Sequence, residues 1–185
     1  SGSSRIPWQE GRGSSAALRY RRVVAPLDGS ARADSVLPLA AILARTLAAQ
    51  VLLVHVVQRP QMPRRTPPSQ EDSDLADRIV ERNRSEVEQY LDVIRSQLPP
   101  EAVETRVLVS SHVSAALHEL VEQDNADLVV LCAHGYSSEM RWPYGGLVGG
   151  FVAYGTSPLL ILQDASAEEV APTPAEIAAQ NYGRR

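Results

Sequence analysis

The most informative run of the chain is Cys132-Ala-His-Gly-Tyr-Ser-Ser-Glu-Met-Arg-Trp-Pro-Tyr-Gly145-Gly146. It follows Asp127-Leu-Val-Val-Leu, a continuous apolar run of the kind that forms a buried parallel strand. It precedes residues 146–154, for which we expect a helix despite the four glycines at positions 145, 146, 149 and 150. A glycine-bearing loop between a strand and a helix lets backbone N–H groups turn toward an anion. This order predicts an α/β sheet with an anion-binding loop at the carboxyl end of one strand.

Four other apolar runs have the length of strands, at residues 22–27, 51–57, 103–109 and 158–162. Three helices are expected between them, over residues 33–49, 69–98 and 114–121. The apolar residues that recur at helical spacing in the first two helices are Val36, Leu39, Leu43, Leu47, Leu75, Ile79, Val87, Leu91, Ile94 and Leu98. The alternation of strands and helices predicts a five-stranded parallel sheet with helices on both faces.

Two features mark the ends of the expected helices. Pro38 must lie in an early turn of its helix or bend it, and Ser69 is suited to cap the long helix that ends at Pro99. Residues 58–68 carry four prolines and three arginines, a composition that indicates a loop.

Composition narrows the function classes. The chain has 185 residues with 44% hydrophobic content, which suits one α/β domain with tails. Its net charge is −4, and all 18 basic residues are arginine, so neither nucleic-acid binding nor lysine chemistry is expected. The single cysteine excludes an internal disulfide, and no run approaches the roughly 20 apolar residues of a membrane span. We therefore expect a cytoplasmic protein without a membrane segment.

The expected domain covers residues 21–163. Residues 1–20 are interpreted as an N-terminal linker or a cloning remnant, and residues 164–185 as a polar tail. Thr173-Pro-Ala-Glu176 matches a capping box, which indicates a short helix within that tail.

Pro26-Leu-Asp28-Gly-Ser30 and the loop that begins at Cys132 together resemble the universal stress protein family, in particular its A-type members. The family signature is Gly, two residues, Gly, nine residues, Gly, then Ser or Thr. Here Cys132, Gly135, Gly145 and Gly146 stand at these positions, so the spacing is kept and two residue types differ. The resemblance implies an adenine nucleotide alpha hydrolase-like, Rossmann-like three-layer sandwich that holds ATP at the carboxyl ends of its strands.

The resemblance also implies a set of nucleotide-binding residues, with ATP and Mg as the candidate ligands. They are Pro26, Leu27, Asp28, Val56, Gly135, Arg141, Gly145 and Gly146. Three departures from the family pattern weaken this expectation: Cys132 and Ser111 replace glycines, and Gly146 replaces a hydroxyl residue. A lost hydrogen bond to a charged phosphate costs about 1.5–3 kcal/mol, although Arg141 and the Gly-Gly turn are conceivable compensations.

We expect a regulatory or interaction module of the stress response with weakened or absent ATP binding. One alternative is an ATP-binding switch that uses the loop from Cys132 to Gly146. A third class is a nucleotide phosphohydrolase. Because the chain offers no convincing pair of a nucleophile and a base, an enzyme is not expected. Dimers of the family pair their fifth strands, which implies an interface at Leu159, Leu160 and Ile161. Family domains also occur in tandem, so a second domain in a longer parent chain fits the resemblance.

Several candidate residues also have a plain structural interpretation. Asp28 is either a ligand or a turn former that bonds the backbone two residues on. His55 is interpreted as a hydrogen-bonded core histidine without chemistry, and Cys132 as an inert buried thiol. His134 has a structural interpretation beside a phosphate-facing one, and His112 and His118 do not match a zinc spacing. The aromatic residues Tyr136, Trp142, Tyr144 and Tyr154 either cap the sheet end or form a partner surface or a base-stacking platform.

Overall fold

A computed structural model describes residues 20–61, 67–99, 101–134 and 144–163. The predictions for the two tails, Gly135, Tyr136, Arg141 and Trp142 lie outside these residues.

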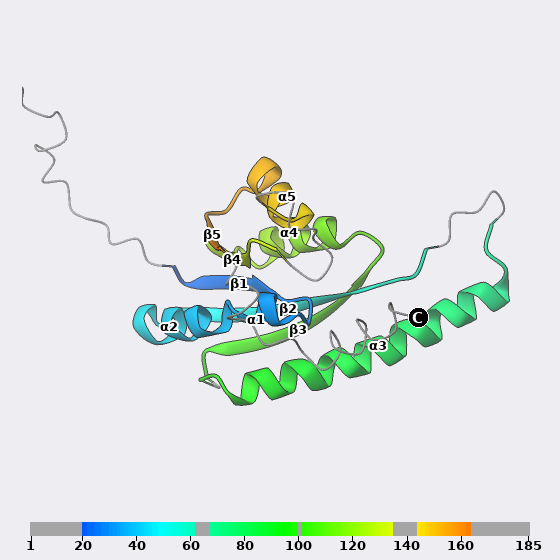
Figure 1. Cartoon of the computed structure of the whole chain (residues 1–185), viewed down its shortest axis with the longest axis horizontal. Coiled ribbons are helices and arrows are strands. Elements are labelled where there is room, and N and C mark those ends of the chain that lie inside the picture. The colour runs from blue at the N-terminus through cyan, green and yellow to red at the C-terminus, as the bar shows by residue number, and fades with distance from the viewer. Residues whose placement is uncertain (1–19, 62–66, 100, 135–143, 164–185) are drawn as a thin grey trace, which may run out of the picture.

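The described chain forms one five-stranded sheet (Figure 1). Its strands are β1 (Arg22–Pro26), β2 (Gln50–Gln58), β3 (Val103–Ser110), β4 (Leu128–Cys132) and β5 (Leu159–Leu162). They lie in the order β3-β2-β1-β4-β5, and every neighbouring pair is parallel. The central strands are continuous apolar runs because side chains on both of their faces are buried. The predicted fold class is confirmed.

Helices cover both faces of this sheet. They are α1 (Ala31–Asp34), α2 (Leu37–Leu47), α3 (Gln70–Ser96), α4 (Val113–Gln123) and α5 (Gly146–Tyr154). One core cluster joins α1, α2 and α3 to alternate strand residues such as Val23 and Leu53; the other joins α4 and α5 to the opposite set, such as Val24 and Leu52. In Figure 1, α4 and α5 accordingly lie above the sheet and α3 below it.

The prediction of one helix over residues 33–49 was wrong in detail, because the segment forms two helices. Ser30 caps α1 by accepting a hydrogen bond from the Ala33 N–H at 3.1 Å. Pro38 lies in the first turn of α2, where its missing N–H costs nothing, so it starts a helix and does not interrupt one. Alanines at positions 40, 41 and 44 bury the inner face of α2, whereas Leu47 is 40% exposed.

The long helix α3 begins as predicted. Ser69 and Asp72 form a reciprocal capping box, with Asp72 in place of the more usual Glu. The expected apolar stripe is only partly buried, because Leu75 and Ile79 remain 49% and 38% exposed. Figure 1 shows the reason, since the N-terminal end of α3 runs past the end of the sheet.

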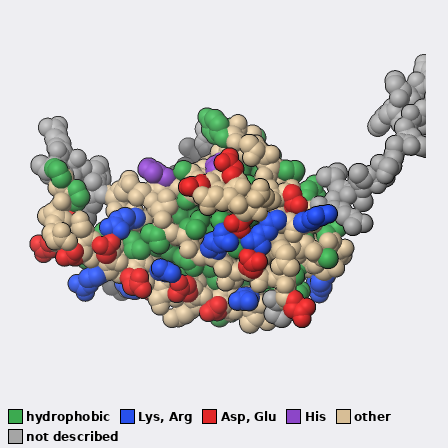
Figure 2. Space-filling model, turned by 180° about the vertical axis from the view of Figure 1, so that it is seen from behind, with side chains coloured by type: hydrophobic (Ala, Val, Ile, Leu, Met, Phe, Trp, Pro, Cys, Tyr) green, Lys and Arg blue, Asp and Glu red, His purple; other side chains and the backbone are tan. Residues whose placement is uncertain are grey.

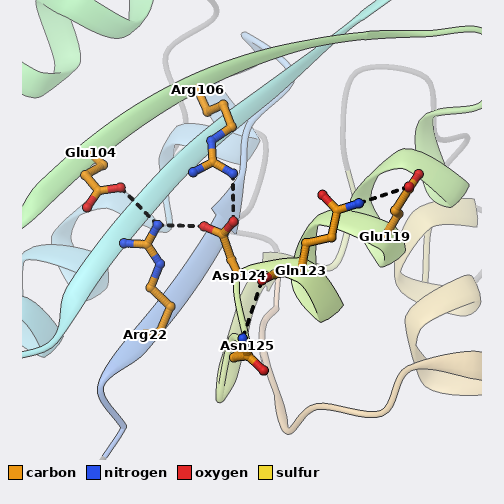
Figure 3. A network of polar contacts seen from close by, with 7 residues as sticks. All are labelled: Arg22, Glu104, Arg106, Glu119, Gln123, Asp124 and Asn125. Carbon is orange, nitrogen blue, oxygen red and sulfur yellow. Dashed lines mark hydrogen bonds and ion pairs between the residues drawn. The ribbon is translucent and has the colours of Figure 1, made fainter.

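An ion-pair network holds the amino-terminal end of the sheet together (Figure 3). Asp124, which ends α4, accepts hydrogen bonds from Arg22 of β1 at 2.6 Å and from Arg106 of β3 at 2.8 Å, and Arg22 also donates to Glu104 at 2.9 Å. Burial alone would raise the pKa of Asp124, but the two arginines outweigh it and hold that pKa below its ordinary value. Nearby, Asp127 accepts backbone N–H groups from the start of β1.

The surface carries both signs of charge. Figure 2 shows arginine and acidic side chains interspersed over one face, without a large region of either sign. Among the helices of the described residues, none has the length and apolar character needed to cross a membrane.

Candidate functional site

A cavity of about 880 Å³ lies at the carboxyl ends of β1, β2 and β4. The order of strand addition reverses at β1, because β2 and β3 lie on one side of it and β4 and β5 on the other. Such a switch point leaves a crevice in which parallel α/β sheets bind ligands. The predicted residues that line this cavity are Pro26, Leu27, Asp28, Val56, Gly145 and Gly146. The structure therefore brings together every predicted nucleotide-binding residue that it describes.

Strand β2 exposes backbone groups to the cavity because it extends further than its neighbour β1. β1 ends at Pro26, opposite Val54, and the last hydrogen bond between the two strands runs from the Leu27 N–H to the Val54 carbonyl at 2.8 Å. Backbone groups two residues apart in a strand point to the same side, so the N–H and C=O of Val56 face the gap beyond β1. No backbone hydrogen bond joins Val56 to β1 or Leu27 within the described chain. The gap can thus accept a planar ligand edge that carries both a donor and an acceptor.

The N-termini of helices α4 and α5 form a second wall of the cavity, beside the strand ends. α4 presents Val113 and Ser114, and α5 presents Gly146 and Leu147. Neither helix has a side-chain cap: His112 and Gly145 stand at the capping positions without a capping hydrogen bond. The first N–H groups of each helix therefore remain available, and the helix dipoles favour an anion at this wall.

Asp28 adopts the turn-forming role, which is one of the two roles expected for it. Its Oδ1 accepts from the Ser30 N–H at 3.0 Å and from the Ser30 hydroxyl at 2.6 Å. These bonds hold the turn that leads into α1, with Gly29 at the positive φ of 78°. The side chain is nevertheless exposed at the rim of the cavity, so a ligand role remains a prediction.

The third wall of the cavity belongs to α3, and the sequence reasoning missed it. Asn83, Glu86, Val87 and Tyr90 line this wall. The Tyr90 hydroxyl donates to Asp34, which ties α3 to α1, and burial together with this carboxylate raises the pKa of Tyr90. The helical spacing of these four residues is the only sequence signal that could have placed them on one face.

His55 lies between this wall and the strand ends. It lines the cavity and packs edge-on against Tyr90, with 6.4 Å between the ring centroids. The expectation of a hydrogen-bonded core histidine was wrong, because its buried Nδ1 has no partner within the described chain. Burial lowers the pKa of His55, and the nearby Asp28 carboxylate opposes this effect only in part.

Cys132 is a buried thiol, as expected, with 9% of its surface exposed. It stands in the cavity wall at the end of β4, and its sulfur accepts a hydrogen bond from the Ser35 hydroxyl at 3.7 Å. The side chain therefore occupies space that a glycine at this position would leave to a ligand.

The remaining candidate residues do not form a second site. His118 stacks on Phe151 between α4 and α5, with 4.1 Å between the ring centroids, while His112 is exposed. The described residues contain no group of three or more His, Cys, Asp or Glu side chains that could hold a metal ion. His134 lines the cavity, and Tyr144 and Tyr154 are exposed, at 40% and 81%.

Comparison with known proteins identifies the family. The sequence profile of the universal stress protein family matches residues 19–163. The chain belongs to the universal stress protein family. A comparison with curated protein sequences gives no significant match.

Solved structures of universal stress proteins and a related protein share the fold. The hypothetical protein MJ0577 superimposes with a TM-score of 0.70 at 15% identity, over 81% of this chain and 100% of that one. Universal stress protein UspA from Lactobacillus plantarum gives a TM-score of 0.63 at 19% identity, over 78% of this chain and 98% of that one. An Arabidopsis thaliana family member, At3g01520 with AMP bound, gives 0.53 at 13% identity, over 84% and 99%.

Proposed function

We propose that this universal stress protein is a regulatory module whose cavity binds an adenine nucleotide reversibly and more weakly than members that carry a hydroxyl residue after the last signature glycine. The observation that carries the proposal is the convergence of available backbone groups on one cavity. The open edge at Val56 suits the base, and the uncapped N-termini of α4 and α5 suit the phosphates. The AMP bound to the Arabidopsis relative supports a nucleotide of this class.

The weaker affinity follows from two residues. Gly146 stands at the start of α5 and supplies no hydroxyl group, which removes about 1.5–3 kcal/mol of phosphate binding, or a factor of roughly 10 to 100 in affinity. The sulfur of Cys132, in the cavity wall at the end of β4, reduces the space left for a ligand. Backbone N–H groups remain as the main phosphate ligands, and Mg is proposed only as a companion of the nucleotide.

Calorimetric titration with ATP, ADP and AMP, with and without Mg, tests the proposal. Native mass spectrometry of the purified protein first shows whether a nucleotide copurifies. We expect saturable binding in the range of tens of micromolar to millimolar, without release of phosphate. An absence of binding at millimolar nucleotide would contradict the proposal and favour a nucleotide-free interaction module. Phosphate release that Asp28→Ala abolishes would favour an enzyme instead.

We further propose that the protein pairs with a second copy through β5. This strand is a terminal strand of the sheet, and Leu160 on it is 37% exposed. An apolar terminal strand favours pairing with another strand. Leu160→Arg should lower the sedimenting mass of the assembly, and an unchanged mass would contradict pairing at this edge.

A further inference from the structure

Within the described residues, the edge of the sheet opposite β5 is formed by β3, a longer strand, and is also open. β3 runs over eight residues without proline, and among the described strands it pairs only with β2. Hydrogen bonds from Val51 to Ala102 and from Arg59 to Ser110 show that the even-numbered residues turn their backbone groups toward β2. The N–H and C=O groups of the odd-numbered residues therefore face outward. These residues are Val103, Thr105, Val107 and Val109, and none of their backbone groups bonds to another described residue outside β3.

We propose that this edge pairs antiparallel with β3 of a second copy of the chain, about a twofold axis at Thr105. Pairing two outward-facing edges lets each facing pair exchange both of its backbone hydrogen bonds. In this register Thr105 faces Thr105 of the second copy, and Val103 faces Val107. Facing pairs of threonine and of β-branched residues stabilise neighbouring strands. This contact is separate from the proposed nucleotide binding and from the proposed pairing of β5.

The charges on β3 select the register. Glu104 and Arg106 flank Thr105 on the face that α4 covers, so the axis at Thr105 places each of them opposite the other residue in the second copy. An axis at Arg106 would place two arginines opposite each other, and an axis at Glu104 would do the same with two carboxylates. Like charges in facing positions destabilise strand pairs, whereas opposite charges stabilise them. Moving the axis by two residues, to Val107, avoids facing like charges but forms no ion pair between the two copies.

Both charged side chains can take part in such a contact. In the network at the amino-terminal end, Glu104 accepts only through Oε2 and Arg106 donates only through Nη1. Their side chains remain 52% and 39% exposed. Each can therefore keep its partner within the chain and gain one in the second copy.

A cysteine at the proposed axis tests the register directly. In a hydrogen-bonded antiparallel pair the facing Cα atoms are about 5.5 Å apart, which suits a disulfide. Thr105→Cys in the full chain should therefore give a covalent dimer under mild oxidation on a non-reducing gel. Val109→Cys is the matched control: it lies on the same strand and face and is 44% exposed, but its two copies would lie about 25 Å apart. The wild-type chain reports any background from Cys132.

Covalent dimer from Thr105→Cys well above the Val109→Cys level would support the proposal. Equal amounts from both variants, or none from a Thr105→Cys protein with a native circular dichroism spectrum, would overturn it. Sedimentation in the Leu160→Arg background gives a second measurement with the β5 contact weakened. That protein should still form a dimer, and Thr105→Lys should convert it to a monomer while Val109→Lys does not. A Leu160→Arg protein that is already monomeric at high concentration would overturn pairing through β3.

Discussion

The polar groups at the two ends of the sheet differ in whether they are paired within the described chain. At the amino-terminal end, Arg22, Glu104, Arg106 and Asp124 bond to one another across β1, β3 and α4. At the carboxyl end, polar groups surround a cavity, and the open backbone of Val56 and the uncapped helices α4 and α5 have no such partners in the described chain. The groups that stabilise the sheet and the groups that can bind a ligand therefore lie at opposite ends of the same strands. Substitutions in the ion-pair network should therefore leave ligand binding at the cavity intact.

The largest effect is expected at the amino-terminal end. Asp124→Ala leaves two arginines without their shared carboxylate, which is mostly buried, with 15% of its side chain exposed. The free energy of unfolding should fall by roughly 2–4 kcal/mol, measured by chemical denaturation. Nucleotide affinity at the other end should stay within about twofold of wild type under native conditions. The matched control is the exposed neighbour Glu122→Ala, for which a change below about 0.5 kcal/mol is expected. A large loss of nucleotide affinity in folded Asp124→Ala would contradict the separation of stability from ligand binding.

The second prediction concerns affinity at the cavity. Gly146→Ser places a hydroxyl at the start of α5, and a Cβ at this position meets no atom within 4 Å among the described residues beyond its own helix and chain neighbours. Nucleotide affinity should rise by a factor of about 10 to 100, measured by calorimetry, with little change in stability. Gly149→Ser is the control, because its Cβ is equally unobstructed but it does not line the cavity. An equal effect of both changes would show that helix propensity and not phosphate contact is responsible.

A smaller effect is expected where the cavity rim also supports the fold. Asp28→Ala removes the acceptor of the two Ser30 hydrogen bonds and should cost about 1 kcal/mol of stability. Asp28→Asn keeps an acceptor oxygen and should recover most of that loss. Denaturation and calorimetry on both variants separate the two roles of Asp28. Affinity lost in both variants indicates that a ligand contacts the carboxylate, whereas affinity lost only with Asp28→Ala indicates an effect of the turn.

The smallest effect is a dependence of stability on pH. Because burial lowers the pKa of His55 in the folded protein, its protonation favours the unfolded chain. Stability should be complete above the unfolded pKa of about 6.5 and should decline as pH falls from there through the folded pKa. His55→Gln should flatten this decline in denaturation curves between about pH 7 and 5. An unchanged decline in His55→Gln would mean that other groups cause it.

The sequence predicted the sheet well because its signals are local. Each central strand is a continuous apolar run, and the residues that end β1 and begin α5 carry the family pattern. The division into α1 and α2 was missed, since helical spacing continues from Val36 to Leu43 while Pro38 and Ser30 set the real boundaries.

The features that the sequence did not reveal depend on register and on distant partners. The open edge at Val56 follows from how far β2 extends past β1, a difference in strand length that no apolar run specifies. The partners of Asp124 lie 18 and 102 residues away in the chain, so only the folded sheet brings them together. The α3 wall was missed for the same reason, because Tyr90 meets Asp34 across 56 residues.

Cys132 gives the cavity a natural reporter. It is the only thiol in the chain and is almost fully enclosed by the wall in which it stands. The rate at which a thiol reagent modifies the folded protein therefore measures how often that wall opens, with no engineered label and no competing cysteine. A slower rate in the presence of a small molecule would identify occupants of the cavity by screening, before any of their affinities is measured.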